Sequence, residues 1–194
     1  MKSKFYSLLL SLLISFTSFA QNTALAFDGA DDYATLPSGI VQSISGDFTI
    51  ETWVYWKGGG DWQRIFDFGN NTSNFMFLTP KSGAGLNTIR FAIGVGGVNE
   101  YLETPFLPIN QWYHVAVTVN NASNTGRLYV NGVLKNTRSI TFRPSNLGNT
   151  TINWLGRSIF GSPSPDPYLN GNLDEFRIWS VERTQTQIKQ NMFG

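Results

Sequence analysis

The sequence has 194 residues, of which 14% are charged, and its formal net charge is +1 at pH 7. This balance argues against a nucleic-acid or anionic-membrane partner, because such partners need a basic surface. Cysteine is absent, so no disulfide framework supports the fold. The length suits one domain with a sizeable core. The many glycines and the 14% of aromatic residues favour a β-rich protein with many turns.

Residues 1–20 have the pattern of a secretory signal peptide. Two lysines precede an apolar run over residues 5–16, and small residues follow up to Ala20. That order of basic start, apolar segment and small residues is typical of a cleaved leader. The run is too short for a membrane-spanning helix. We therefore expect cleavage after Ala20 and a secreted domain over residues 21–194, with a membrane anchor as the alternative.

The first half of the mature chain alternates between strand patterns and turn signals. The longest run, 48–56, places Phe48, Ile50, Val54 and Trp56 on one face, and Glu51, Trp53 and Tyr55 on the other. Such alternation predicts a strand with one face in the core. A Gly-rich segment at 58–62 predicts a flexible loop. Further strands are expected at 23–27, 33–36, 64–68, 75–78 and 89–93.

The second half continues the same pattern. In the clearest strand, 112–119, the valines and Tyr113 face the core, whereas Trp112 and His114 face the other way. Asn131-Gly132 predicts a tight hairpin, because both turn residues need positive φ. Other elements are expected at 150–156 (strand), 162–167 (Pro-rich loop), 171–179 (strand) and 183–192 (short helix). About a dozen short strands without a long helix predict an antiparallel sandwich or jelly roll.

The last predicted strand, 171–179, carries a carboxylate beside an apolar face. Its alternation places Asp174 on the same face as Phe176 and Ile178. A half-buried carboxylate is costly unless it is paired, hydrogen-bonded or bound to a metal ion. The other dense acidic group, Asp28, Asp31 and Asp32, lies near the start of the mature chain. We therefore expect the two ends of the chain to meet in space.

These landmarks, in this order, resemble the concanavalin A-like, laminin-G-type jelly roll of secreted bacterial proteins, over residues 24–190. The matching segments are Leu25-Ala26-Phe27-Asp28-Gly29, Asp31-Asp32-Tyr33, Phe48-Thr49-Ile50-Glu51-Thr52-Trp53-Val54, Trp112-Tyr113-His114-Val115-Ala116-Val117-Thr118, Leu128-Tyr129-Val130-Asn131-Gly132, Leu155-Gly156 and residues 171–179. The resemblance implies an all-β sandwich of two curved antiparallel sheets, with the first and last strands as neighbours and a short C-terminal helix. It also implies a carbohydrate-binding or adhesion role, although some relatives are glycosidases or polysaccharide lyases, so the fold alone does not decide the function.

Calcium is the metal that this resemblance implies. Calcium prefers six to eight oxygen ligands from carboxylates, carbonyls and water. Asp28, Asp32 and Asp174 would supply carboxylates, and the turn at Gly29 a carbonyl. The alternative is that these aspartates only stabilise turns through hydrogen bonds to the backbone.

A carbohydrate surface is the second expected site. Aromatic rings stack on the apolar faces of sugars, while nearby polar groups fix the hydroxyls. Trp62 and Tyr168 are the best candidates, because loops often carry binding residues. Trp53, Trp112 and His114 are further candidates on the second faces of their strands. The alternative is that these rings belong to the core.

Several features of the sequence argue against catalysis. The Glu-x-Asp-x-x-Glu pattern of retaining glycosidases on this fold is missing from the sequence. His114 is the only histidine, and no Gly-x-Ser-x-Gly motif accompanies it. If Val119 pairs with Leu128, His114 would lie about 13 Å from Tyr129, too far for the acid and base of a lyase.

The sequence thus predicts a secreted, non-catalytic module that binds the glycan of a polysaccharide or glycoprotein, stabilised by calcium. A glycoside-acting enzyme, or its inactive remnant, is the first alternative. A protein-binding adhesion module with a cell-surface partner is the second. The chain is either a stand-alone module or a fragment of a larger protein.

Overall fold

The computed structural model describes residues 23–83, 87–161 and 165–192. The predicted signal peptide and residues 162–164 of the predicted Pro-rich loop lie outside these residues. No helix in the described part of the chain is both long and apolar enough to span a membrane.

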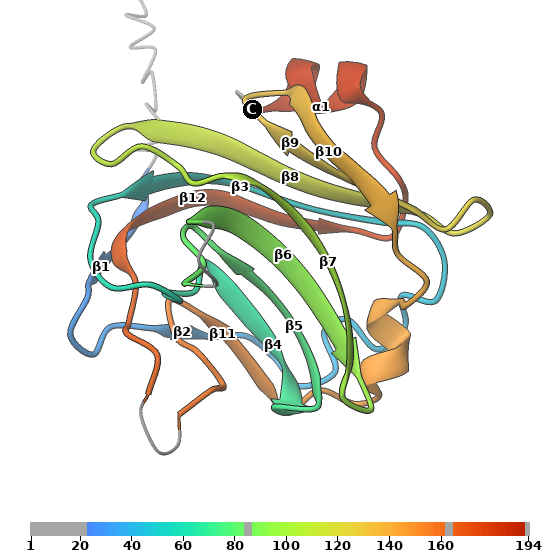
Figure 1. Ribbon diagram of the computed structural model, residues 1–194, viewed down its shortest axis with the longest axis horizontal. Coiled ribbons are helices and arrows are strands. Elements are labelled where there is room, and N and C mark those ends of the chain that lie inside the picture. Colours follow the sequence, from blue (N-terminus) through green and yellow to red (C-terminus); the bar gives the residue numbers. More distant parts are fainter. Residues whose placement is uncertain (1–22, 84–86, 162–164, 193–194) are drawn as a thin grey trace, which may run out of the picture.

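Two antiparallel sheets of six strands each pack face to face, so the predicted two-sheet sandwich is confirmed (Figure 1). Sheet A has the strand order β1-β12-β3-β8-β9-β10, and sheet B has the order β2-β11-β4-β5-β6-β7. Sheet A comprises β1 (Leu25–Asp28), β12 (Asn170–Trp179), β3 (Phe48–Trp56), β8 (Trp112–Asn120), β9 (Thr125–Val130) and β10 (Val133–Ser139). Sheet B comprises β2 (Ala34–Thr35), β11 (Ile152–Leu155), β4 (Phe66–Asn71), β5 (Asn74–Thr79), β6 (Thr88–Val95) and β7 (Val98–Pro105). A short 3-10 helix, η1 (Pro144–Leu147), lies between β10 and β11.

The core lies between the sheets and follows the predicted alternation. In β3, Phe48, Ile50 and Val54 are at most 2% exposed, and they face into the sandwich. Phe66 and Phe68 of β4 pack there from sheet B. Each such side chain contributes about 1.5–3 kcal/mol through burial.

Helix α1 (Gln185–Asn191) covers part of the outer face of sheet A, which confirms the predicted C-terminal helix (Figure 1). Thr184 caps the helix, because its side chain accepts a hydrogen bond from the backbone N–H of Gln187. Ile188 is fully buried against Ala116 and Tyr129 of the sheet. The helix therefore closes part of sheet A to solvent.

The first and last strands are neighbours, as predicted, but Asp174 does not face the core. Strand β12 has a bulge between Asp174 and Arg177, and Glu175 there adopts a φ of 51°. The extra residue shifts the alternation, so Asp174 lies opposite Trp53 on the outer face, whereas Phe176 packs against the core. The predicted common face for Asp174 and Phe176 is wrong for this reason.

The register of β8 and β9 also differs from the assumed one. Val117, not Val119, lies opposite Leu128, and Ala116 lies opposite Tyr129. The connecting turn is short and β9 begins at Thr125, so the pairing shifts by two residues. His114 is then two positions from the residue opposite Tyr129, roughly 7 Å along the strand.

Candidate functional site

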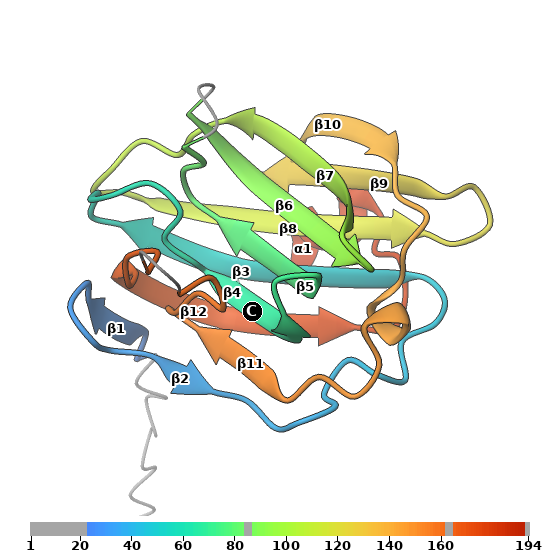
Figure 2. The ribbon, with the colours of Figure 1, turned by 60° about the horizontal axis from the view of Figure 1, so that its bottom comes forward.

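Among the residues that the structure describes, no helix covers the outer face of sheet B (Figure 2). One row of directly paired residues crosses all six strands of this face. The row is Thr35, Trp154, Asp67, Phe77, Ala92 and Tyr101, from β2 to β7. Paired residues of antiparallel strands share a face, so the row places three aromatic side chains and one carboxylate on the same surface.

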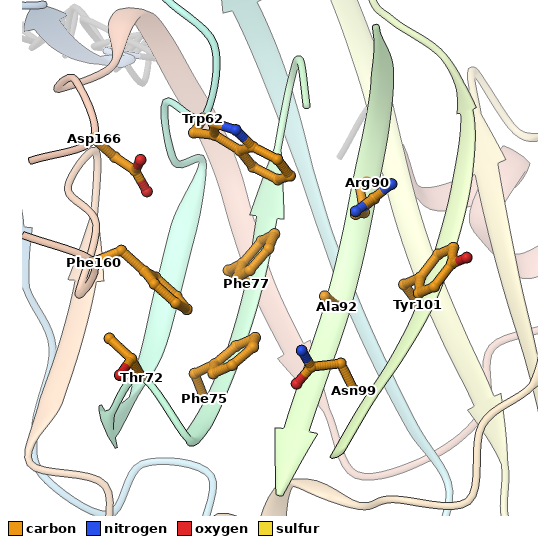
Figure 3. Close-up of a pocket in the computed structure, with 10 residues that line it drawn as sticks. All are labelled: Trp62, Thr72, Phe75, Phe77, Arg90, Ala92, Asn99, Tyr101, Phe160 and Asp166. Atoms are coloured by element: carbon orange, nitrogen blue, oxygen red, sulfur yellow. The ribbon is translucent and has the colours of Figure 1, made fainter. Parts of the chain in front are cut away.

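A pocket of about 420 Å³ lies on this face, over β5, β6 and β7 (Figure 3). Its lining combines rings with a few polar groups: Trp62, Thr72, Phe75, Phe77, Arg90, Ala92, Asn99, Tyr101, Phe160 and Asp166. Figure 3 shows Phe160 and Asp166 on one side of the two phenylalanines of β5, with Arg90 and Tyr101 on the other. An apolar hollow with few convergent polar groups is the usual form of a small-ligand site.

The floor of the pocket is a cluster of aromatic rings. Phe75 and Phe77 are stacked, with 5.4 Å between ring centroids and 13° between planes. Phe160 meets Phe75 edge-on at 5.0 Å, and Trp62 meets Phe77 edge-on at 6.3 Å. Both strand phenylalanines are at most 5% exposed, so the half-buried rings of Trp62, Phe160 and Tyr101 form the accessible apolar rim.

Trp62 is held by an anchored loop and has an unusual backbone. Gln63 is buried; its side-chain oxygen accepts hydrogen bonds from the Trp56 indole and from the backbone N–H of Asn170, and its side-chain nitrogen donates to the Gly58 carbonyl. These bonds tie the Gly-rich segment to the sheet edge. Trp62 itself has a φ of 66°, which is a genuine outlier for a bulky residue. Such conformations cost roughly 1–3 kcal/mol and are concentrated at functional sites.

A buried arginine joins the two loops that wall the pocket. Arg64 is 2% exposed, and its guanidinium donates to Asp67 of β4, to Asp166 and to the carbonyl of Trp62. It also lies 4.1 Å from the ring centroid of Phe77. Removing either partner of a buried ion pair is strongly destabilising, so this network fixes the positions of Trp62 and Asp166.

Asp67 has the most perturbed carboxyl group of this network. Burial raises its pKa to about 6, although Arg64 and the backbone N–H of Ile159 act in the opposite direction. Its Oδ1 atom has no hydrogen-bond partner among the described residues. The carboxyl group therefore loses its proton only near pH 6.

The opposite rim of the pocket carries a salt bridge. Arg90 donates from Nε and Nη2 to one carboxylate oxygen of Glu103, at 3.0 and 2.7 Å. Burial alone would raise the pKa of Glu103, but hydrogen bonds from Arg90 and Thr88 hold it below its usual value. The guanidinium also lies 4.7 Å from the Tyr101 ring centroid. Arg90 is thus held at the pocket, and the N–H groups that do not bind Glu103 can donate to a ligand.

The structure brings one of the five predicted ligand-binding residues into this pocket. Trp62 lines it. Tyr168 lies on the same side of the molecule but contacts a different ring, that of Tyr33, at 6.3 Å. Trp53 and His114 meet each other at 5.4 Å on the outer face of sheet A. Trp112 is 39% exposed and contacts Tyr55 on that same sheet.

His114 is a buried histidine of sheet A, in contact with neither the pocket nor Tyr168. Its Nε2 lies 3.8 Å from Glu51, and its Nδ1 has no hydrogen-bond partner among the described residues. Burial lowers the pKa of His114 to about 4, and Arg177 acts in the same direction. The imidazole is therefore neutral at pH 7.

The acidic loop after β1 brings together Asp28, Asp31 and Asp32, whose carboxylate oxygens lie within 4.8 Å of one another. Hydrogen bonds from Ala30 and neighbouring backbone amides hold the pKa of Asp28 below its usual value. Gly29 turns with a φ of 81° beside Asn170. Asp28 pairs with Asn170, four residues before Asp174, so the two carboxylates are roughly 13 Å apart along the strand. The expectation that Asp28 and Asp174 meet is wrong.

Most residues that line the pocket were not predicted. Phe75 and Phe77 alternate with the core residues Met76 and Leu78. The run is therefore apolar on both faces, a signal that the outer face of this strand is also covered. Tyr101 and Asn99 lie on β7, a strand that was not predicted.

Comparisons with solved structures agree with this architecture. A candidate carbohydrate binding protein from Bacteroides ovatus is 26% identical, with a TM-score of 0.64, over 84% of this chain and 45% of that protein. This chain thus spans less than half of that protein. Domain 4 of AbnA, an extracellular GH43 arabinanase from Geobacillus stearothermophilus solved with arabinotriose, is 23% identical, with a TM-score of 0.69, over 86% of this chain and 75% of that one.

A third structure is the CBM40 of the IT-sialidase from Ruminococcus gnavus. It is 13% identical, with a TM-score of 0.63, over 82% of this chain and 96% of that one. At such identities the second and third likenesses show the fold alone. No curated protein matches the chain in sequence. A family model described as the concanavalin A-like lectin/glucanases superfamily matches residues 28–189. The chain belongs to that superfamily.

Proposed function

We propose that this domain binds a glycan in the aromatic pocket on the outer face of sheet B. The observation that carries the proposal is the composition of the pocket: three accessible rings, Trp62, Tyr101 and Phe160, surround a stacked floor. Ring faces pack against the C–H faces of sugars, and a few fixed polar groups give orientation.

The polar groups at the pocket suit sugar hydroxyls. Arg90 offers N–H donors, and Asn99 and Thr72 are exposed at the rim. Figure 3 shows the Asn99 amide directed towards Phe75. Because these donors and acceptors lie beside aromatic rings, a sugar can form hydrogen bonds through its hydroxyl groups while its C–H face packs on a ring.

The related structures support a carbohydrate ligand. The Bacteroides ovatus protein is described as carbohydrate binding, the arabinanase domain was solved with arabinotriose, and the sialidase CBM40 was also solved with α2,3-sialyllactose. These ligands differ, so they support the class of ligand and not one sugar. The arabinanase is extracellular, which agrees with the secretion that residues 1–20 predict.

A binding role without catalysis is part of the proposal. Of the described residues that line the pocket, Asp166 has the only carboxylate. Its Oδ2 accepts hydrogen bonds from Arg64 and from the Ser158 hydroxyl, so this carboxylate belongs to the network that holds the pocket walls. Glycoside hydrolysis uses a pair of carboxyl groups about 5–10 Å apart on either side of the bond. His114 lies on the other sheet and does not supply the missing partner.

The calcium site is proposed in a narrower form than the sequence suggested. Asp28, Asp31 and Asp32 would provide hard oxygen ligands from one turn, and Asp174 is left out. Their spacing fits a shared cation, and the lowered pKa of Asp28 keeps that carboxylate ionised. The ion would stabilise the turn that leads into β2.

Affinity electrophoresis tests the proposal. The protein is run through native gels that contain plant, algal or animal polysaccharides, with calcium and with a chelator. We expect retardation by at least one glycan, and no release of reducing sugar from it. Retardation by none would contradict the proposal and favour a protein partner. Release of reducing sugar would favour the enzyme alternative.

A further inference from the structure

Arg157 is surrounded by three aromatic rings on the outer face of sheet B. Its guanidinium carbon lies 4.2 Å from the ring centroid of Trp154, 4.7 Å from that of Tyr33 and 5.7 Å from that of Tyr168. The rings also contact each other, at 5.9 Å between Tyr33 and Trp154. Three rings around one cation hold it in a single position through cation–π attraction.

The charge of Arg157 has no acidic partner among the described residues. Its guanidinium forms no hydrogen bond and no ion pair with them. By contrast, Arg64, Arg90 and Arg127 are each paired with a carboxylate. Arg138, Arg143 and Arg183 also lack such a pair, but Arg138 is exposed, and Arg143 and Arg183 donate to backbone carbonyls. Arg157 is half-buried between the three rings, and its five N–H donors are without a partner among the described residues.

This cluster of Arg157, Tyr33, Trp154 and Tyr168 is separate from the pocket but shares its face. Trp154 lies opposite Asp67, and Asp67 lies opposite Phe77 at the floor of the pocket. Two strand spacings separate Trp154 from Phe77, roughly 10 Å. The segment around Ile159 runs between them, because its N–H binds Asp67. An oligosaccharide that follows this face can reach both places.

The chemistry of the cluster indicates an anion. A guanidinium presents paired N–H donors that match the two oxygens of a carboxylate or sulfate. Because the rings already hold the side chain, little rotamer freedom is lost on binding. The exposed edge of Tyr33, which is 44% exposed, leaves the cluster open on one side. A neutral sugar would leave these charge-assisted bonds unmade.

We propose that Arg157 and its three rings bind the carboxylate or sulfate group of an acidic glycan. The inference rests on the proposed function, because it assigns the ligand of that same face to the acidic glycans. In this proposal one oligosaccharide binds at two sites, the pocket and the Arg157 cluster.

Matched ligands test this inference. Calorimetry compares oligogalacturonide with its neutral methyl ester, and a sulfated galactan oligosaccharide with its desulfated form. We expect the acidic form to bind about ten- to hundredfold more tightly, the range that a charge-assisted hydrogen bond supplies. The preference should fall as salt is added, since screening weakens exposed charges. Preference in only one pair would identify carboxylate or sulfate as the group that is recognised.

Three variants separate the two sites. Arg157→Gln should bind acidic and neutral forms alike. Lys135→Gln, which removes one charge from exposed β10, should keep the preference. Trp62→Gly, in the pocket, should weaken binding of both forms. Thermal unfolding checks that each variant is folded.

The outcomes distinguish this inference from the proposed function. An acidic preference that survives in Arg157→Gln, or wild-type protein that binds both forms equally, overturns the inference and leaves glycan binding intact. Binding that needs Arg157 but not Trp62 supports the anion site and overturns the pocket. If no oligosaccharide binds, titration with sodium galacturonate decides, followed through the Arg157 Nε–H signal by NMR. A shift of that signal supports the anion site, and an unchanged signal overturns it.

Discussion

The indole ring of Trp62 meets the ring of Phe77 edge to face, with 6.3 Å between their centroids and 87° between their planes. The contact joins a loop to the middle of sheet B, and Arg64 reinforces it by lying over Phe77 and donating to the Trp62 carbonyl. The candidate for sugar stacking that lines the pocket is thereby fixed at the edge of a rigid floor. Preorganised rings lose little entropy on binding.

Replacing Trp62 with glycine should weaken glycan binding by about tenfold, or about 1.4 kcal/mol. Glycine adopts the φ of 66° without strain, so the backbone of the loop is kept while the ring is lost. Calorimetry on a glycan that retards the wild-type protein measures the change. Trp112→Ala, on sheet A, is the control and should bind normally. Equal losses in the two variants would contradict a pocket on sheet B.

Asp67 should make the protein less stable as pH rises from about 4 to 6. Its pKa is raised to about 6 in the folded state, so the folded protein holds a proton that the unfolded chain has lost. The stabilisation from this proton is complete below the pKa of Asp67 in the unfolded chain, about 3.9. It disappears above the pKa in the folded protein, a change on the order of 3 kcal/mol. The lowered pKa of His114 contributes the opposite slope over this range, so urea unfolding between pH 4 and 7 should show the Asp67 slope in His114→Asn and lack it when Asp67→Asn is added to that variant.

His114 should act in the opposite direction over an overlapping range. Its folded pKa is lowered to about 4, so the unfolded chain binds a proton more readily. The stabilisation is full above about 6.5 and is lost as pH falls through 4, again on the order of 3 kcal/mol. His114→Asn should remove this loss, and the stability of that variant should then fall with rising pH because of Asp67. A flat profile in both single variants would show that neither group titrates as described.

Calcium should raise the melting temperature by several degrees, because an ion that binds only the folded state stabilises it by mass action. Asp28→Asn should abolish the rise, since Asp28 lies in the three-aspartate turn. Asp174→Asn should preserve the rise in melting temperature, because Asp174 lies four residues along β12 from Asn170, the residue that pairs with Asp28. Calorimetric scans with calcium and with chelator make the comparison. An effect lost only in Asp174→Asn would refute the narrower site.

The sequence could predict the strands that alternate cleanly. β3 runs from Phe48 to Trp56, as the pattern of residues 48–56 predicts, and the Asn131-Gly132 turn does join β9 to β10. These elements have one clearly apolar face and turn residues with a defined backbone preference. Their physical signals are local, so one sequence is sufficient to detect them.

The features that could not be predicted depend on partners that are distant in sequence. Strand β7 lies at the edge of sheet B, and Leu102 is its one buried side chain, so it shows little alternation. The bulge at Glu175 leaves no sequence pattern, although it moves Asp174 to the outer face. The pocket combines β5, β6 and β7 with two loops. Its rings come together only when the register between those strands is known.

NMR of the indole N–H groups would show directly whether a glycan binds over Trp62 on sheet B. The chain has six tryptophans, each with one indole signal, and they are distributed over both sheets. During titration with a glycan that retards the protein, we expect the Trp62 signal to shift and the Trp53 and Trp112 signals to stay unchanged. Shifts at Trp53 or Trp112 with Trp62 unchanged would place the ligand on sheet A and contradict the account.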